Sequence, residues 1–399
     1  MRYDFDSYLN RRETGSSKWL NMDSRNPNVD RDVVPMSVAD MDFLTCTEIN
    51  EEICNYVNSQ TLGYSKPVDS YLQTVVDFFR EHHNYSAEKD WIVTTPGIVS
   101  ALATSVNAFT EIGDEVIIFT PVYHPFYEVI EGQKRVIKEC PLIYNNNAYS
   151  INFELLEKLA SSSKVKMILF CNPHNPGGIV WSKEELIRIE EIAVKYDLLI
   201  VSDEIHSDIV FKGKKHMVFG SISETIGERC VVCTAASKTF NIAGLQCSNI
   251  FIKNEDLRNE FVTANVNIGL ERANILGMVA TKAAYEKGLN WLDEVKTIIE
   301  KNNNIVEKFF NSYNNLFKVM KPEASFLTWV NFENLEIEHE EFMKFLDIKC
   351  EFFVNDGLSF GENGKYFIRI NTGLPTKKLE ENLERLKKYL KECYNVISK

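Results

Sequence analysis

The sequence predicts an α/β fold in which a large domain has a mostly parallel sheet covered by helices, accompanied by a smaller α+β domain. Four short runs have the nearly continuous apolar character of strands buried on both faces; they are residues 115–121, 166–173, 198–204 and 231–237. The stretch 182–197 is amphipathic, with Ser182 as a candidate N-cap and Glu185 three residues later. This strand–helix–strand order is typical of an open α/β sheet.

The last third of the chain has a different pattern. Residues 291–310 are typical of a long helix, and short strands are expected at 326–332, 350–354 and 366–371. A final helix is indicated by one apolar stripe, formed by Leu379, Leu383, Leu386, Leu390 and Cys393. We therefore expect a large domain at 46–285 and a smaller domain made of 286–399 together with an N-terminal arm at 1–45.

Composition narrows the class of protein. The 399 residues carry 44 basic and 57 acidic side chains, a net charge of −13, which argues against a nucleic-acid partner because phosphate recognition depends on clustered Lys and Arg. No apolar run reaches the roughly 18 to 20 residues of a membrane span, and the N-terminus lacks the apolar core of a signal peptide. Nine cysteines without regular spacing indicate thiols in a reducing compartment. We expect a cytoplasmic enzyme without a membrane partner.

A metal site is not expected. The chain has one Cys-x-x-Cys pair, Cys230 and Cys233, inside a predicted strand and without a second ligand cluster after it.

Polar residues follow each of the four predicted strands. They are Thr120-Pro121, Asn172-Pro173, Asp203-Glu204 and Ser237-Lys238. Ligands of open α/β sheets bind beyond the carboxyl ends of the strands, so these residues fall where a site is expected.

Lys238 and Asp203 are the main candidates for chemistry. A lysine partly desolvated at a strand end has a lowered pKa, and its neutral amine can form a Schiff base. A carboxylate after the apolar run that ends at Asp203 needs a cationic partner, and a protonated pyridine nitrogen is one. The alternatives are a solvated loop lysine at Lys238, and a helix cap or surface ion pair at Asp203.

Two further segments could complete a cofactor site. The turn 172–178, with two X-Pro steps and two glycines, can hold the Asn175 amide fixed, although a simple tight turn explains it equally. Residues 95–101 end a short strand and open an apolar helix at Gly97, and the N–H groups of such a helix start form an anion site.

In this order, these pieces resemble fold-type I pyridoxal-phosphate enzymes of the class I/II aminotransferase superfamily, and so imply a fold like that of the pyridoxal-phosphate-dependent transferases. Within the superfamily, the chain resembles the MalY/PatB-type cystathionine β-lyase (C–S lyase) branch. The segments that carry this resemblance are 38–43, Gly63-Tyr64, 203–206 and 237–246.

The resemblance implies a role for each matching residue. Lys238 would bond to the cofactor, Asp203 would pair with its pyridine nitrogen, and Asn175 would donate to its phenolic oxygen. Tyr64 would reach the site from the neighbouring subunit, which implies a homodimer with shared active sites. Tyr123 would stack on the ring, His206 would lie beside the cofactor, and the phosphate would be bound by Gly97, Ile98 and Ser237. Ala39 and Asn175 would contact the substrate, and Arg369 would bind the substrate carboxylate.

Two residues depart from the wider aminotransferase pattern. His206 stands where a tyrosine is usual, and Gln246 stands where an arginine is frequent. Both departures resemble the lyase branch, and they leave the partners of the phenolic oxygen and the phosphate open.

The implied activity is the cleavage of cystathionine or a related S-substituted cysteine to a thiol, pyruvate and ammonia. The alternatives are an aminotransferase of an α-amino acid and a regulatory protein that retains the cofactor site.

The sequence does not determine which residues form the substrate side-chain pocket; the aromatic candidates are His124, Phe126, Tyr127 and Trp329. We expect His82 and His83 to be exposed on a polar helix end.

Overall fold

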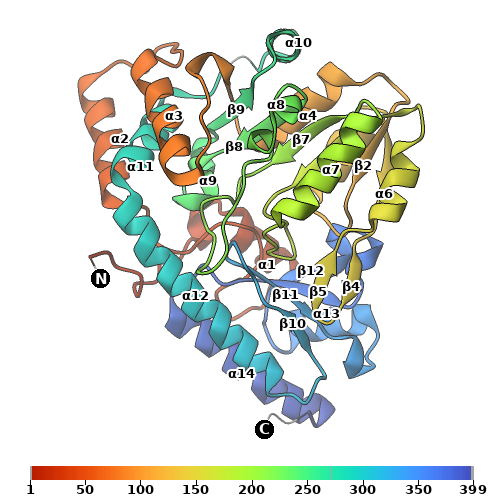
Figure 1. The fold of residues 1–399 in the computed structure, drawn as a ribbon. Helices are drawn as coiled ribbons and strands as arrows, with labels where there is room; N and C mark the ends of the chain where they lie inside the picture. The colour runs from red at the N-terminus through yellow and green to blue at the C-terminus, as the bar shows by residue number, and fades with distance from the viewer. Residues whose placement is uncertain (1, 271, 397–399) are drawn as a thin grey trace.

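A seven-stranded sheet forms the centre of the larger part of the molecule, in the upper half of Figure 1. The computed structural model describes residues 2–270 and 272–396. In spatial order the strands are β1 (Ile92–Thr95), β9 (Ser248–Ile252), β8 (Cys230–Thr234), β7 (Leu199–Asp203), β6 (Val165–Cys171), β2 (Glu115–Ile118) and β3 (Val136–Glu139). From β8 to β3 all neighbours are parallel, whereas β9 pairs antiparallel with both β1 and β8. The expected α/β fold with a mostly parallel sheet is confirmed.

Both faces of this sheet are covered by helices. Alternate residues of β2 show this, because Val116 and Ile118 belong to one hydrophobic cluster and Ile117 to another. The cluster of Val116 includes residues of α4 (Ile98–Phe109), α5 (Pro125–Glu131) and α10 (Glu255–Asn267). The cluster of Ile117 includes residues of α2 (Thr47–Ser59), α3 (Asp69–His83), α6 (Phe153–Ala160), α7 (Lys183–Lys195), α8 (Glu224–Gly227), α9 (Ala236–Thr239) and α11 (Ile275–Lys287). Burial on both faces explains why these strands are apolar without alternation.

Helix α7 begins where its sequence predicts. The Ser182 side chain accepts from the backbone N–H of Glu185, and the Glu185 carboxylate accepts from the backbone N–H of Ser182, a complete capping box.

A second, four-stranded antiparallel sheet lies in the lower half of Figure 1. Its order is β10 (Lys318–Met320), β11 (Leu327–Asn331), β13 (Phe367–Asn371) and β12 (Asn355–Asp356). The apolar side chains of α1 (Ser17–Arg25), α13 (His339–Ile348) and α14 (Thr376–Tyr394) share one core with this sheet. A small hairpin, β4 (Ile143–Asn145) and β5 (Ala148–Ser150), pairs with neither sheet. It packs against the small sheet, because Trp329 of β11 donates to the Tyr149 hydroxyl at 3.2 Å.

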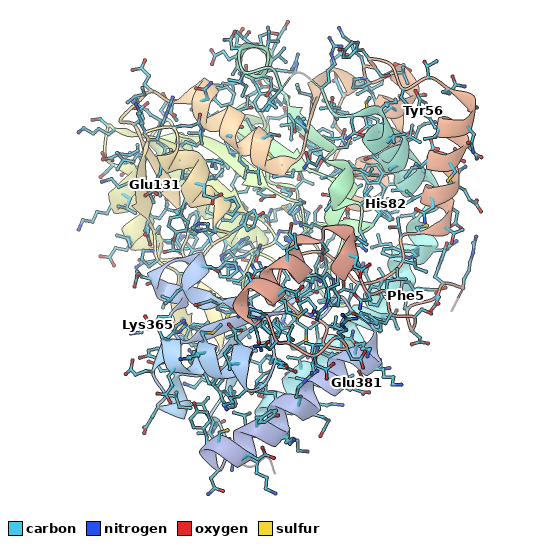
Figure 2. All side chains as sticks on the ribbon, turned by 180° about the vertical axis from the view of Figure 1, so that it is seen from behind. Phe5, Tyr56, His82, Glu131, Lys365 and Glu381 are labelled. Carbon is cyan, nitrogen blue, oxygen red and sulfur yellow. The ribbon has the colours of Figure 1, made fainter. Side chains whose placement is uncertain are left out.

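Helix α12 (Leu289–Asn311) joins the two cores. Its first half, with Trp291 and Val295, packs in the core of the large sheet, and its last turns, with Val306 and Phe310, pack in the core of the small one. Phe5, labelled in Figure 2, lies 5.7 Å from Trp291 between ring centroids, so the N-terminal segment also contacts this helix. The division at 46–285 stays a prediction.

Three local expectations are corrected. Residues 350–354 do not form a strand; Phe352, Phe353 and Val354 are buried in the small core, and the strand on that side is β12. The apolar stripe of α14 ends at Leu390, since Cys393 is exposed. His83, expected to be exposed, is 8% exposed and packs against the body of the molecule, while His82 is exposed.

All nine cysteines are free, and Cys230 and Cys233 lie within β8. None of the described helices is long and apolar enough to span a bilayer. The described residues also contain no group of three or more His, Cys, Asp or Glu side chains arranged to hold a metal ion.

Candidate functional site

A cavity of about 310 Å³ opens beyond the carboxyl ends of β6, β7 and β8. Of the four strand-end pairs expected at the site, Asp203, Ser237 and Lys238 line this cavity, whereas Thr120-Pro121 and Asn172-Pro173 are not among the described residues that do. Most of the residues that the sequence singles out for the site line it: Ala39, Gly97, Ile98, Tyr123, Asn175, Asp203, His206, Ser237 and Lys238. Those on the large sheet come together because parallel strands end at the same edge.

Lys238 lies in α9, the short helix that follows β8. Its Nζ donates a hydrogen bond to the backbone carbonyl of Ala39 at 2.6 Å. Loss of hydration lowers the pKa of Lys238 to about 8. A lysine with this pKa is half neutral at about pH 8, and its neutral amine is a competent nucleophile and base.

Asp203 ends β7 and is 2% exposed. Its Oδ1 accepts from the backbone N–H of Ile205 at 3.2 Å, and no cationic side chain pairs with it among the described residues. Burial raises its pKa to about 7. A buried carboxylate that lacks a cation fits a protonated pyridine nitrogen, and so these residues fit a pyridoxal cofactor.

Arg369 lies on β13 and is 3% exposed. Its guanidinium donates to Asn175 Oδ1 at 2.9 Å and to Asn355 Oδ1 at 2.8 Å, and its Nε has no hydrogen-bond partner among the described residues. Burial lowers its pKa to about 10. A buried arginine that contacts two neutral amides and no carboxylate among the described residues is complementary to a carboxylate ligand.

Gly97 forms the junction between β1 and α4. Its φ of 90° lies in the region that favours glycine, and a Cβ there would meet no atom within 4 Å, so the junction faces open space. The first N–H groups of α4, beginning at Ile98, have no intrahelical acceptor. With the Ser237 side chain on the same cavity, this junction can bind an anion such as a phosphate.

The chain is similar to known proteins over nearly its whole length. The family model described as aminotransferase class I and II matches residues 31–386. The chain belongs to the class I and II aminotransferase family. The family and the fold type that the sequence resembles are therefore confirmed.

Three relatives in this family are informative. Cystathionine β-lyase PatB of Bacillus subtilis is 38% identical over 356 residues, 89% of this chain and 92% of that protein. The crystal structure of cystalysin from Treponema denticola, which contains a pyridoxal 5′-phosphate cofactor, is 41% identical with a TM-score of 0.97, covering 98% of this chain and 100% of that one. The pyridoxal-phosphate-bound C–S lyase of Staphylococcus hominis is 30% identical with a TM-score of 0.90, covering 98% of each chain.

The two departures from the wider aminotransferase pattern both line the cavity. His206 Nδ1 lies 3.0 Å from the Ser325 hydroxyl. The other ring nitrogen, Nε2, has no hydrogen bond in the described part of the chain, and the residue lines the cavity. Burial lowers the pKa of His206 to about 3, so its ring is neutral. Gln246 lines the same cavity, so a neutral amide stands where this family frequently has a guanidinium.

Several candidates lie outside the cavity. Tyr64 is fully exposed between α2 and α3, and a role at a neighbouring subunit's site stays a prediction. The aromatic candidates His124, Phe126, Tyr127 and Trp329 are not among the described residues that line it. Trp329 instead stacks on Phe367 at 4.9 Å within the small sheet's region.

Sequence reasoning missed the side chains that support the site from behind. His83 Nε2 lies 2.6 Å from Asp208 Oδ1, and Thr239, next to Lys238, donates to the other carboxylate oxygen at 2.6 Å. His216 similarly lies 2.7 Å from buried Glu204, next to Asp203. No local pattern in the sequence predicts these pairs, because the two residues of each pair come from separate segments of the chain.

Proposed function

We propose that this protein is a pyridoxal-phosphate-dependent C–S β-lyase that converts cystathionine or a related S-substituted cysteine to a thiol, pyruvate and ammonia. The observation that carries the chemistry is that Lys238, with its lowered pKa, and Asp203, without a cationic partner, line one cavity. The lyase assignment is supported by the three relatives described above.

When bound, the cofactor supplies a pyridinium ring that accepts the electron pair left on the substrate α-carbon after proton removal. Asp203 would hold the proton on the pyridine nitrogen, because its buried carboxylate is stabilised only beside a cation. Asn175 would donate its amide N–H groups to the phenolic oxygen, since its Oδ1 is occupied by Arg369. Gly97, Ile98 and Ser237 would bind the phosphate, Tyr123 would contact the ring, and His206 would lie beside it.

Lys238 would remove the α-proton with its neutral amine, so that an N–H bond forms as the C–H bond breaks. Arg369 would hold the substrate carboxylate, with Ala39 and Asn175 beside it, and thereby orient the C–H bond toward Lys238. The bond between the β-carbon and sulfur then breaks, the sulfur leaves with the electron pair as a thiolate, and the thiolate takes up a proton. One water molecule balances the release of pyruvate and ammonia.

The decisive experiment incubates the purified holoenzyme with cystathionine and no keto acid. Steady release of pyruvate and free thiol in equal amounts is the expected result. An aminotransferase would use the same Lys238 and Asp203 but would need a keto acid to turn over repeatedly. Strict dependence on an added keto acid, with no thiol released, would therefore overturn the lyase proposal. A panel with cystine and alkyl cysteines identifies the preferred substrate.

We also propose a homodimer with shared active sites. The fully exposed Tyr64 side chain, together with exposed Leu62 and Val68 in the same connection between α2 and α3, supports a contact surface there. Tyr64 of one subunit would then serve the cavity of the other.

A further inference from the structure

A segment near the N-terminus, residues 38–42, places a backbone carbonyl against the Lys238 amine. The segment has no regular secondary structure, and its Ala39 carbonyl accepts from Lys238 Nζ at 2.6 Å. Under the proposed function, Lys238 carries a free amine at the step in which it takes the α-proton. The Ala39 carbonyl is then the hydrogen-bond acceptor of the base itself.

The orientation of the Ala39 carbonyl is fixed by contacts of the residues on either side of it, Val38 and Asp40. Val38 has a φ of 54°, a left-handed conformation that is unfavourable for a β-branched residue and persists only when its surroundings impose it. Asn371 Nδ2 donates to the carbonyls of Val38 at 2.7 Å and of Asp40 at 2.6 Å, the two residues that flank Ala39. The peptide between them therefore has little freedom to rotate.

A compact ion cluster holds the far end of the segment. Lys18, with a fully buried side chain, places its Nζ 2.9 Å from Asp40 Oδ1 and 2.8 Å from Asp42 Oδ2. The same Nζ donates to the Asp40 backbone carbonyl at 2.9 Å. Arg11 contacts the carboxylates of Asp40 at 3.0 Å and Asp42 at 2.7 Å. Two cations and two anions are thus locked together beside the catalytic lysine.

Asp40 stays ionised and acts on Lys238. Burial opposes its ionisation, but Lys18 and Arg11 outweigh burial and lower the pKa of Asp40 to about 2. Loss of hydration is the main influence on the Lys238 pKa, and the charge of Asp40 is the largest opposing one, which raises that pKa. The other described titratable groups around the amine or in its cavity are Asp203, Arg369, Lys18, His206, Tyr123, Cys171 and Cys247.

We propose that Asp40, held by Lys18 and Arg11, is a positioning residue that orients the Lys238 amine through the Ala39 carbonyl and stabilises its protonated form during proton transfer. Asp40 is not among the described residues that line the cavity. It acts because its charge is fixed close to the nitrogen on which positive charge develops.

Three full-length variants test this role. Asp40→Asn removes the negative charge that raises the Lys238 pKa, with little change of shape. Lys18→Met removes a positive charge that lowers the Lys238 pKa. Asp42→Asn is the matched control, because it removes the same charge from the same cluster but does not flank Ala39. Thermal unfolding shows which variants are folded.

The first readout is the pKa of the Lys238 amine in cofactor-free protein, measured from the pH dependence of its acetylation by acetic anhydride, with the Lys238 peptide quantified by mass spectrometry. We expect Asp40→Asn to lower this pKa by about one unit, since the ammonium loses its neighbouring anion. Lys18→Met should raise it by about half a unit, and Asp42→Asn should change it by less than about 0.3 unit. Shifts of opposite sign cannot come from a general loss of stability.

The second readout is the kinetic isotope effect on kcat with an α-deuterated S-alkyl cysteine and the holoenzyme. Asp40→Asn should increase it, because proton removal becomes more rate-limiting, while Asp42→Asn should not. Equal amine pKa shifts in the two aspartate variants, or no shift in either, would overturn the proposal. If either Asp40→Asn or Lys18→Met does not fold, the sign of the Lys238 pKa shift in the other variant decides whether the proposal holds. The acetylation uses no substrate, so its result stands apart from any failure of the lyase proposal.

Discussion

Asn175, in the turn after β6, accepts a hydrogen bond from the guanidinium of Arg369, on β13 of the small sheet, at 2.9 Å. One residue thus joins the proposed cofactor contact to the proposed substrate contact. Because the Asn175 carbonyl oxygen is engaged by Arg369, its amide N–H groups are free to serve the cofactor. The bond also fixes one edge of the guanidinium plane, while the Nε atom of Arg369 has no hydrogen-bond partner in the part of the chain that the structure describes.

Arg369→Lys should lower kcat/KM for cystathionine by about 100-fold, mainly by raising KM. Lysine keeps the positive charge but loses the planar fork that matches a carboxylate. Steady-state kinetics of pyruvate release measure this effect. Asn355→Ala is the control, since it removes a bond to the other guanidinium nitrogen without touching the proposed carboxylate contact, and it should cost about tenfold or less. Equal losses in both variants would contradict the assigned role of Arg369.

Lys238→Ala should lower kcat by at least about 1,000-fold, because both the covalent attachment point and the base are lost. The yellow colour of the covalently attached cofactor should disappear from the purified variant. Absorption spectra and pyruvate release measure the two effects. A variant that keeps its colour and turns over at the native rate would show that another residue carries the chemistry.

Asp203→Asn should stabilise the cofactor-free protein while it removes activity. Folding raises the pKa of Asp203 from 3.8 to about 7, so the folded protein binds this proton more tightly and its free energy of unfolding falls as the pH rises through that window. Asparagine removes this loss, and at about pH 8 the variant should be more stable than the native protein by roughly 1–4 kcal/mol. The difference should shrink toward pH 4. Urea unfolding at several pH values measures it; a less stable variant at about pH 8 would contradict the buried, unpaired carboxylate.

Mixed dimers test the shared active site. Tyr64→Ala and Lys238→Ala should each be nearly inactive alone. After unfolding and refolding of an equal mixture, half of the dimers contain one chain of each kind, and in these one site has both lesions and the other has none. About a quarter of native activity should return. If no activity returns although mixed dimers form, Tyr64 serves its own subunit. If Tyr64→Ala alone keeps native activity, Tyr64 plays no part in the reaction.

The central strands were predictable because their sequences carry the signal of burial on both faces. The predicted run 198–204 contains β7, and 166–173 covers β6 except its first residue, Val165. Asp203, at the end of β7, does line the cavity, whereas after β6 it is Asn175 in the following turn, not Asn172, that lines it. This inference needs only the rule that parallel strands present their carboxyl ends at one edge. The antiparallel β9 was not predicted, because strand direction is set by connections and pairing rather than by composition.

The errors have a common physical cause. Phe352 and Phe353 look like strand residues because aromatic side chains favour strands, but the preceding Glu351 has a φ of 48° and the segment fills the small core without pairing as a strand. His83 looks like a solvated residue beside His82, but Asp208, 125 positions away, supplies its partner. Long-range partners of polar groups are decided by the fold, and a single sequence does not reveal them.

Helix α12 restricts how this protein can close around a substrate. Its two ends are embedded in separate hydrophobic cores, so a hinge rotation of the small sheet against the large one would have to bend a continuous helix or repack Trp291 or Phe310. Densely packed cores resist such changes. The distance between Arg369 and Lys238 is therefore nearly constant, so a substrate whose carboxylate binds Arg369 presents its α-carbon to Lys238 at a set position. Under the proposed function, different thiol leaving groups would be accommodated by the loops around the cavity.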